Sequence, residues 1–240
     1  MNAFPPTDWS RLAALRDGTD ERKQVILGEL FVRYRDPVLA FVRGRGRSRE
    51  LAEDLVQDFF LYAIEHHLFE KADVARGRFR NLMLASLQHY AANAHRAERA
   101  QMRHPPGGFF SNDVSEISEA ALPSNHSTPE QAFLRSWAET LLGRVLAALR
   151  TEYAGPQRRA HYDILYRFMI APILEGAPQP SQRTLADELG LTEKEVANRL
   201  VTARRAYQRL LRAEIAEYTA NDSEANEEIR ELFVLLGSNR

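Results

Sequence analysis

Large apolar side chains recur at three- and four-residue steps along most of the chain. From the segment ELAEDLVQDFF, residues 50–60, onward, one side of a helix is predicted to be apolar, because an α-helix turns once every ~3.6 residues. The residues on this side are Ala52, Leu55, Val56, Phe59, Phe60, Ala63 and Ile64. The same spacing predicts helices over residues 25–42, 50–68, 78–99, 130–150, 158–174, 183–189 and 192–218. No segment shows the two-residue alternation of a half-buried strand, so the pattern predicts an all-α fold.

Residues 104–129 interrupt this periodicity with a segment rich in proline, glycine, serine and asparagine, a composition typical of a linker. The overlapping stretch 111–134 carries four acids and neither lysine nor arginine, a net charge of −4. A chain of 240 residues is long enough for two domains. We therefore expect two helical domains joined by a flexible acidic linker. The predicted parts are an N-terminal extension (1–19), a first domain (20–103), the linker (104–129), a second domain (130–220) and a C-terminal amphipathic helix (221–240).

The chain contains no cysteine, which excludes disulfides and thiolate metal sites and fits a reducing cytosol. The N-terminal residues MNAFPPTDWSRLAALRDG lack a basic stretch followed by an apolar run, and no segment is apolar over the length of a membrane span. We expect a soluble, cytoplasmic protein that does not contact a membrane.

Charge is strongly sorted along the chain, although the net charge is only −1. Residues 76–103 contain six arginines and one glutamate, a net charge of +5. Residues 194–212 contain six basic residues and one glutamate, again a net charge of +5. Two separate basic stretches predict two contacts with a polyanion.

The segment SQRTLADELGLTEKEVANRLVTARRAYQRLL, residues 181–211, predicts two helices joined by a tight turn. Gly190 can adopt the left-handed conformation that ends the first helix, and Leu191 can fill the turn. Thr192 and Glu195 have the spacing of a capping box that starts the second helix. The pattern therefore predicts a helix-turn-helix whose second helix enters a major groove. An ordinary helical hairpin with a basic, solvated face is the alternative.

Acidic and amide side chains gather on the side of residues 50–68 that lies opposite the apolar face. Glu53, Asp54, Gln57 and Asp58 belong to this side. A charged helix face is usually only solvated, so the segment by itself leaves two interpretations. One is a solvated surface and the other is a docking site for a basic partner.

Three motifs occur in one order along the chain. They are LFVRYRDPVLAFVRGRGRSRELAEDLVQDFFLYAIEHH (30–67), ARGRFRNLMLASLQHYAANAHRAERAQ (75–101) and the helix-turn-helix. Their order and spacing resemble the two conserved domains of a bacterial RNA polymerase sigma factor, in particular the extracytoplasmic-function group of the sigma-70 family. The likeness covers residues 30–103 and 130–217. It implies a transcription initiation factor that uses the polymerase's active site and has no catalytic residues, cofactor or metal of its own.

The resemblance implies core RNA polymerase and promoter DNA, both duplex and melted, as partners, and leaves an anti-sigma factor or another regulator open. The polymerase's largest subunit is expected to dock on Glu53, Asp54, Gln57 and Asp58. The minus-ten element is expected to contact Arg76, Arg78, Arg80, Asn81, Gln88, His89, Asn93, Arg96 and Arg99. The minus-thirty-five element is expected to contact Thr192, Lys194, Ala197, Asn198, Arg199, Thr202, Arg204 and Arg205. In this last set we expect Asn198 to read a base edge and the three arginines to hold phosphates.

Two other classes of protein are alternatives. A stand-alone transcriptional regulator would use only the helix-turn-helix, with the first domain serving dimerisation, which leaves the acidic helix without a role. An RNA- or phosphate-processing enzyme would need a catalytic acid–base pair, a metal set or a phosphate-cradling glycine loop. Adjacent His66 and His67 cannot both face one metal on a regular helix, and no such loop occurs in the sequence.

The tail, residues 221–240, combines a capping residue, acids in its first turns and the apolar stripe Ile229, Leu232, Phe233 and Leu236. This stripe predicts docking on the second domain's own core or, alternatively, on a binding face that the tail would restrain. The acidic linker likewise has two interpretations. It imitates RNA in a basic channel of the polymerase, or it is a passive tether.

Overall fold

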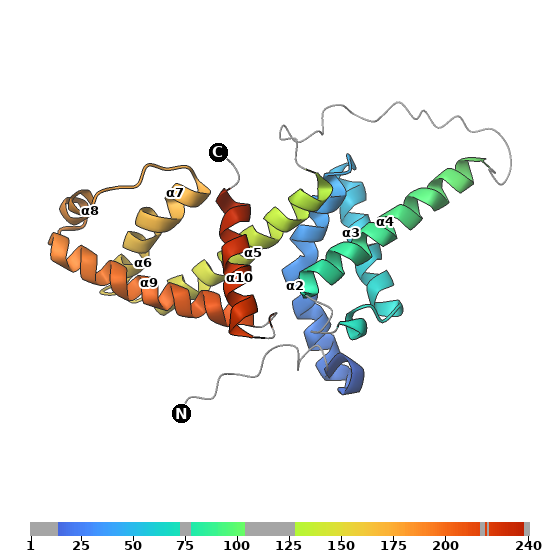
Figure 1. Ribbon diagram of the computed structural model, residues 1–240, viewed down its shortest axis with the longest axis horizontal. Coiled ribbons are helices and arrows are strands. Elements are labelled where there is room, and N and C mark those ends of the chain that lie inside the picture. The colour runs from blue at the N-terminus through green and yellow to red at the C-terminus, as the bar shows by residue number, and fades with distance from the viewer. Residues whose placement is uncertain (1–13, 73–77, 104–127, 217–218, 220, 238–240) are drawn as a thin grey trace. The chain divides into compact units, whose positions relative to one another are not determined.

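The computed structural model describes residues 14–72, 78–103, 128–216, 219 and 221–237 (Figure 1). Within these residues every regular element is helical, which confirms the predicted all-α class. The chain divides into two compact units, residues 1–137 and 138–240, and the boundary falls within α5 (Pro129–Glu152). None of the described helices combines the length and the hydropathy that a membrane span requires.

The first unit is built from three long helices, a short turn and the beginning of α5. Its elements are α2 (Asp20–Arg43), α3 (Arg49–Glu65), the 3-10 turn η1 (Phe69–Lys71), α4 (Phe79–Arg103) and residues 129–137 of α5. Helices α2 and α3 pack against each other. Buried aromatic rings fill the core, and the rings of Tyr34 and Phe79 meet edge to face with their centroids 5.4 Å apart. Aromatic packing therefore connects α2 to the start of α4.

Helix α3 has the apolar face that the sequence predicts. The side-chain oxygen of Ser48 accepts a hydrogen bond from the backbone N–H of Leu51 and caps the start of the helix. Five residues of this face, Ala52, Val56, Phe59, Phe60 and Ala63, are buried, whereas Leu55 is half-buried and Ile64, at the end of the helix, is 43% exposed. Burial of this face directs the opposite face of α3 toward solvent.

The first unit also includes residues that the sequence places in an N-terminal extension. The side chain of Leu15 is only 2% exposed. The guanidinium of Arg16 donates hydrogen bonds to the backbone oxygens of Glu70 and Ala72, at 2.6 and 2.8 Å. Residues 15 and 16 therefore hold the segment around η1 in place.

The second unit is built around α9. Its elements are residues 138–152 of α5, α6 (Arg159–Leu165), the π-helical segment η4 (Tyr166–Ile170), α7 (Ala171–Leu174), α8 (Gln182–Leu189), α9 (Glu193–Ala216) and α10 (Asp222–Gly237). Helix α9 packs against α6, α8 and α10. Ile164 of α6, Leu185 of α8 and Val196 of α9 meet in one fully buried cluster.

The turn between α8 and α9 has the conformation that the sequence predicts. Gly190 adopts the left-handed conformation, with φ 65° and ψ 37°, and ends α8. Leu191 follows and packs against the buried cluster. Thr192 and Glu195 form the reciprocal capping box, in which each side chain accepts a hydrogen bond from the other residue's backbone N–H at 2.8 and 3.2 Å.

Helix α10 packs within the second unit. It contacts α9 and α7. Leu232 and Leu236 are buried, while Ile229 and Phe233 are half-buried. The tail therefore packs on its own unit, which was one of its two predicted sites.

Gly190→Ala should destabilise the second unit, because an L side chain in the left-handed conformation costs about 1 kcal/mol. Crowding does not contribute, since an added Cβ at Gly190 meets no atom within 4 Å. Gly143→Ala is the matched control, because Gly143 also has open space but lies inside α5. This change should stabilise by up to ~1 kcal/mol. Urea unfolding measures the free energy of unfolding of both variants. A change of the same sign in this free energy for the two variants would contradict this interpretation.

Candidate functional site

The outer face of α3 carries an exposed acidic strip. Asp54, Gln57 and Asp58, three of the four predicted polymerase-binding residues, are exposed. Two apolar side chains lie on the same face, Leu51 at 54% exposure and Leu61 at 56%. Leu51, Asp54, Asp58 and Leu61 are separated by three, four and three residues, so they form one line along the helix. We call these four residues the α3 strip.

The two leucines of the α3 strip were missed by the sequence reasoning. Their signal was present, because positions 51 and 61 are out of phase with the buried positions 52, 56 and 59. Exposed apolar area within a charged strip is a common property of protein-binding surfaces. The strip therefore offers both charge and apolar surface to a partner.

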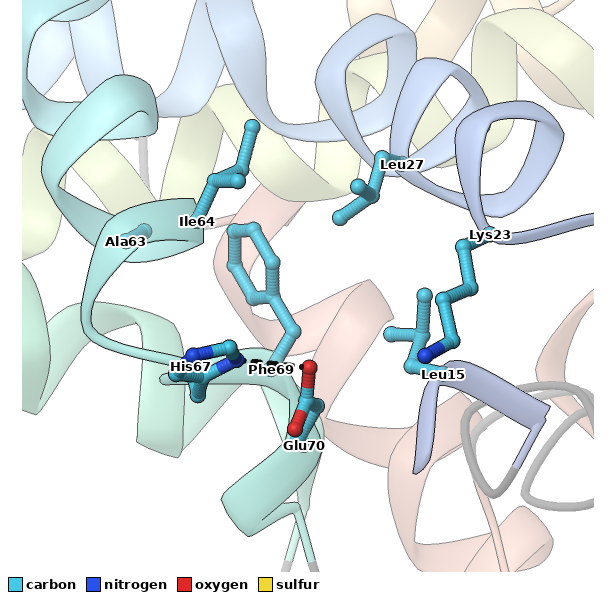
Figure 2. A pocket seen from close by; sticks show the side chains of 8 residues that line it. All are labelled: Leu15, Lys23, Leu27, Ala63, Ile64, His67, Phe69 and Glu70. Carbon is cyan, nitrogen blue, oxygen red and sulfur yellow. Dashed lines mark hydrogen bonds and ion pairs between the residues drawn. The ribbon is translucent and has the colours of Figure 1, made fainter. Parts of the chain in front are cut away.

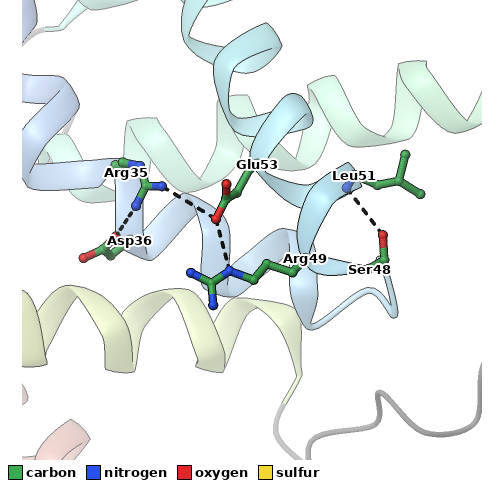
Figure 3. A network of polar contacts seen from close by, with 6 residues as sticks. All are labelled: Arg35, Asp36, Ser48, Arg49, Leu51 and Glu53. Carbon is green, nitrogen blue, oxygen red and sulfur yellow. Dashed lines mark hydrogen bonds and ion pairs between the residues drawn. The ribbon is translucent and has the colours of Figure 1, made fainter.

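Glu53, the fourth predicted docking residue, lies at the edge of the strip and is already paired within the first unit (Figure 3). One oxygen of its carboxylate lies 3.2 Å from Nε of Arg49 and 3.9 Å from a terminal nitrogen of Arg35. Arg35 also contacts Asp36 at 3.0 Å. These partly exposed pairs contribute little to stability, but they partly neutralise Glu53. Asp54 and Asp58 are therefore the stronger attractors for a basic partner.

Arg80 is buried, which is at odds with its predicted contact to DNA. Its side chain is only 5% exposed, and the guanidinium lies over the ring of Trp137, 4.4 Å from the ring centroid. Nearby, the Gln88 amide donates a hydrogen bond of 3.1 Å to Glu130, which lowers the pKa of that carboxyl below its ordinary value. Arg80 and Gln88 therefore hold the beginning of α5 to α4.

The structure brings three other predicted residues of α4 together. His89, Asn93 and Arg96 follow one another at four- and three-residue steps. Asn93 contacts Nδ1 of His89 at 3.3 Å and accepts a hydrogen bond from Arg96 at 2.5 Å. These contacts join an imidazole, an amide and a guanidinium into one polar ridge on α4.

The remaining predicted residues near α4 are not part of this ridge. Asn81 is exposed and Arg78 is half-buried. Arg76, the side chain of Arg99 and the linker acids Asp113, Glu116 and Glu119 lie outside the described residues.

The outer face of α9 carries the exposed basic surface of the second unit. Lys194, Asn198, Arg204 and Arg205 are exposed, whereas Ala197 and Arg199 are half-buried. Lys194, Asn198 and Arg205 lie along one line of the helix, together with Val201, which the sequence reasoning did not single out. We call the line formed by Lys194, Asn198, Val201 and Arg205 the α9 strip.

The hydroxyls of two predicted DNA-binding residues already take part in hydrogen bonds within the protein. The Thr192 hydroxyl takes part in the capping box with Glu195. The Thr202 hydroxyl donates a hydrogen bond of 2.9 Å to the backbone oxygen of Asn198. Neither hydroxyl is therefore a free donor for DNA in this structure.

Arg199 lies at the edge of the α9 surface. Burial lowers the pKa of His161 on α6, and the positive charges of Arg199 and Arg158 add to this effect. The His161 ring stacks on the ring of Tyr153, with centroids 5.1 Å apart and the planes nearly parallel. Arg199 therefore lies close enough to α6 for its positive charge to act on His161.

A small hollow in the first unit contains none of the predicted site residues (Figure 2). Its apolar lining consists of Leu15, which precedes α2, and of side chains from α2, α3 and η1, and its polar groups are Lys23, His67 and Glu70. Nδ1 of His67 contacts the Glu70 carboxylate at 2.8 Å. Among the described residues, no three metal-ligating side chains gather into a site.

Comparison with known proteins gives this chain no family. No protein-family model, no curated protein and no solved structure matches it. The α3 strip, the polar ridge of α4 and the α9 strip are therefore the features on which a functional assignment can be based.

Arg80→Ala should loosen the contact between α4 and α5. In a Trp9→Phe background Trp137 is the sole tryptophan, so its fluorescence reports this contact directly. We expect a shift of the emission to longer wavelength and a loss of roughly 1–2 kcal/mol of stability. Arg43→Ala, at an exposed position of α2, is the control and should change neither quantity. The same emission spectrum in both variants would refute the stacking.

Proposed function

We propose that this protein is a transcription initiation factor that binds core RNA polymerase and directs promoter recognition and DNA opening. The observation that carries the proposal is the presence in one chain of an exposed acidic strip on α3 and an exposed basic strip on α9. A factor that connects polymerase to promoter DNA needs one surface for a protein and another for a polyanion.

The α3 strip supports docking on a basic helical surface of the polymerase. Asp54 and Asp58 provide charge that steers encounter and sets the orientation, which is the usual contribution of interfacial charge. Leu51 and Leu61 provide apolar area, and its burial contributes affinity. This combination favours a specific interface over a merely solvated helix face.

The geometry of α8 and α9 supports binding in the major groove of promoter DNA as a helix-turn-helix. Gly190 produces a tight turn, and the capping box fixes the start of α9. The exposed side chains of Lys194 and Asn198 lie in the first two turns of α9, the part of a recognition helix that contacts base edges. The polar ridge of α4 supports a second contact, with the melted strand.

A stand-alone transcriptional regulator is the second candidate. The α9 strip supports this candidate as well as it supports an initiation factor. Any protein that binds DNA through a helix-turn-helix would have a surface of this kind. The α3 strip distinguishes the candidates. A regulator that acts without polymerase has no need for the exposed acids and leucines that the α3 strip combines.

Asp54→Arg combined with Asp58→Arg should weaken association with core polymerase by more than about tenfold, because like charges would then face each other. The fold should be unaffected, since both side chains are exposed. The matched control is Glu227→Arg with Glu231→Arg on α10, which makes the same change in net charge at exposed positions with the same spacing. Analytical co-elution measures the affinity, and unchanged binding by the Asp54/Asp58 variant excludes docking through α3.

Substitutions on α9 should separate two modes of DNA contact. Arg205→Ala should weaken binding to all duplexes and lower the slope of log affinity against log salt by about one. Asn198→Ala should instead cost roughly 1–3 kcal/mol at a single base position and leave the salt slope unchanged. Titrations of labelled duplexes at several salt concentrations measure both effects. Identical losses on every duplex for the two variants would show that the assigned roles are wrong.

A further inference from the structure

Val201 is an apolar side chain in the middle of an otherwise polar surface. It is 50% exposed on the outer face of α9, between Asn198 and Arg205. The buried positions Val196, Ala203 and Tyr207 lie on the other side of the helix, so Val201 takes no part in the core. A β-branched residue at an exposed helical position is also a poorer helix former than alanine. Neither packing nor helix propensity therefore explains valine at this position.

The neighbours of Val201 enlarge its apolar surface. Ala197 lies one turn earlier on the helix and is half-buried. Thr202 is exposed, and its hydroxyl is bonded back to the oxygen of Asn198, so its methyl group is the part left for an outside contact. A small apolar area is thus surrounded by the polar groups of Lys194, Asn198 and Arg205.

Only one group on the base edges of the major groove matches such an area. Thymine carries a methyl group at C5, whereas the edges of the other three bases present hydrogen-bond donors and acceptors. Arg205, one turn beyond Val201, would hold a phosphate and so fix the position of the helix on the duplex. A side chain at the centre of the strip would then lie at the base edges.

We infer that Val201 contacts the C5 methyl group of a thymine and makes α9 select thymine over cytosine at that base pair. This inference rests on the proposed DNA-binding function of α9. Loss of one buried methyl group corresponds to about a fourfold change in affinity.

The test uses the full-length chain, alone and with bacterial core RNA polymerase, to select duplexes from a random-sequence pool. In the tightest-bound duplex each thymine is then replaced singly by deoxyuridine, which differs only in lacking the methyl group. At one thymine this replacement should weaken wild-type binding by about fourfold. Val201→Ala should bind the original duplex about fourfold less tightly and lose no more with deoxyuridine, because both changes remove the same contact.

Val234→Ala is the matched control, because Val234 is 66% exposed on α10, outside the α9 strip. It should keep the wild-type sensitivity to deoxyuridine. If a duplex is selected but no single replacement changes wild-type affinity, or if Val201→Ala keeps the wild-type loss, the inference on Val201 is overturned and the proposed function stands. If no duplex is enriched in either condition, both are overturned.

Discussion

The second unit depends on the burial of one apolar face of α9. Val196, Ala203, Tyr207 and Leu211 are buried on that face, and α6 and α8 pack against the helix. Because this face of the helix is buried, the α9 strip, which lies on the opposite face, is exposed to solvent. The capping box and Gly190 fix where the helix begins, so the position of every side chain on the strip follows from the core. Stability and the proposed recognition of DNA thus have a common physical origin.

The first unit follows the same principle with the opposite charge. Burial of Ala52, Val56 and Phe59 directs the α3 strip outward. Both strips combine charged and apolar side chains, with a leucine at each end of the acids on α3 and Val201 between polar residues on α9. Charge acts over a longer range and orients a partner, whereas apolar contact acts only when the surfaces meet. A surface that combines charged and apolar side chains therefore suits discrimination between partners better than a surface that only attracts them by charge.

Local features were predictable from the sequence, and contacts between distant segments were not. The helices, the turn at Gly190 and the capping box depend on residues within one or two turns of each other, so periodicity and spacing predict them. Burial of Arg80 depends on Trp137, more than fifty positions away, and burial of Leu15 depends on the packing around η1. An arginine next to a basic run has the same local signature whether it is exposed or buried. The apolar members of the strips were readable in principle, because they are out of phase with the core.

Run-off transcription shows directly whether this protein is a polymerase-dependent initiation factor. The purified full-length chain is mixed with bacterial core RNA polymerase and with templates that carry the selected duplex upstream of a fixed end. We expect RNA of discrete length that requires both proteins, and we expect this RNA to be lost in the variant that combines Asp54→Arg with Asp58→Arg. Tight binding of the duplex by the chain alone, without any polymerase-dependent RNA, would contradict the proposed initiation function and favour a stand-alone regulator.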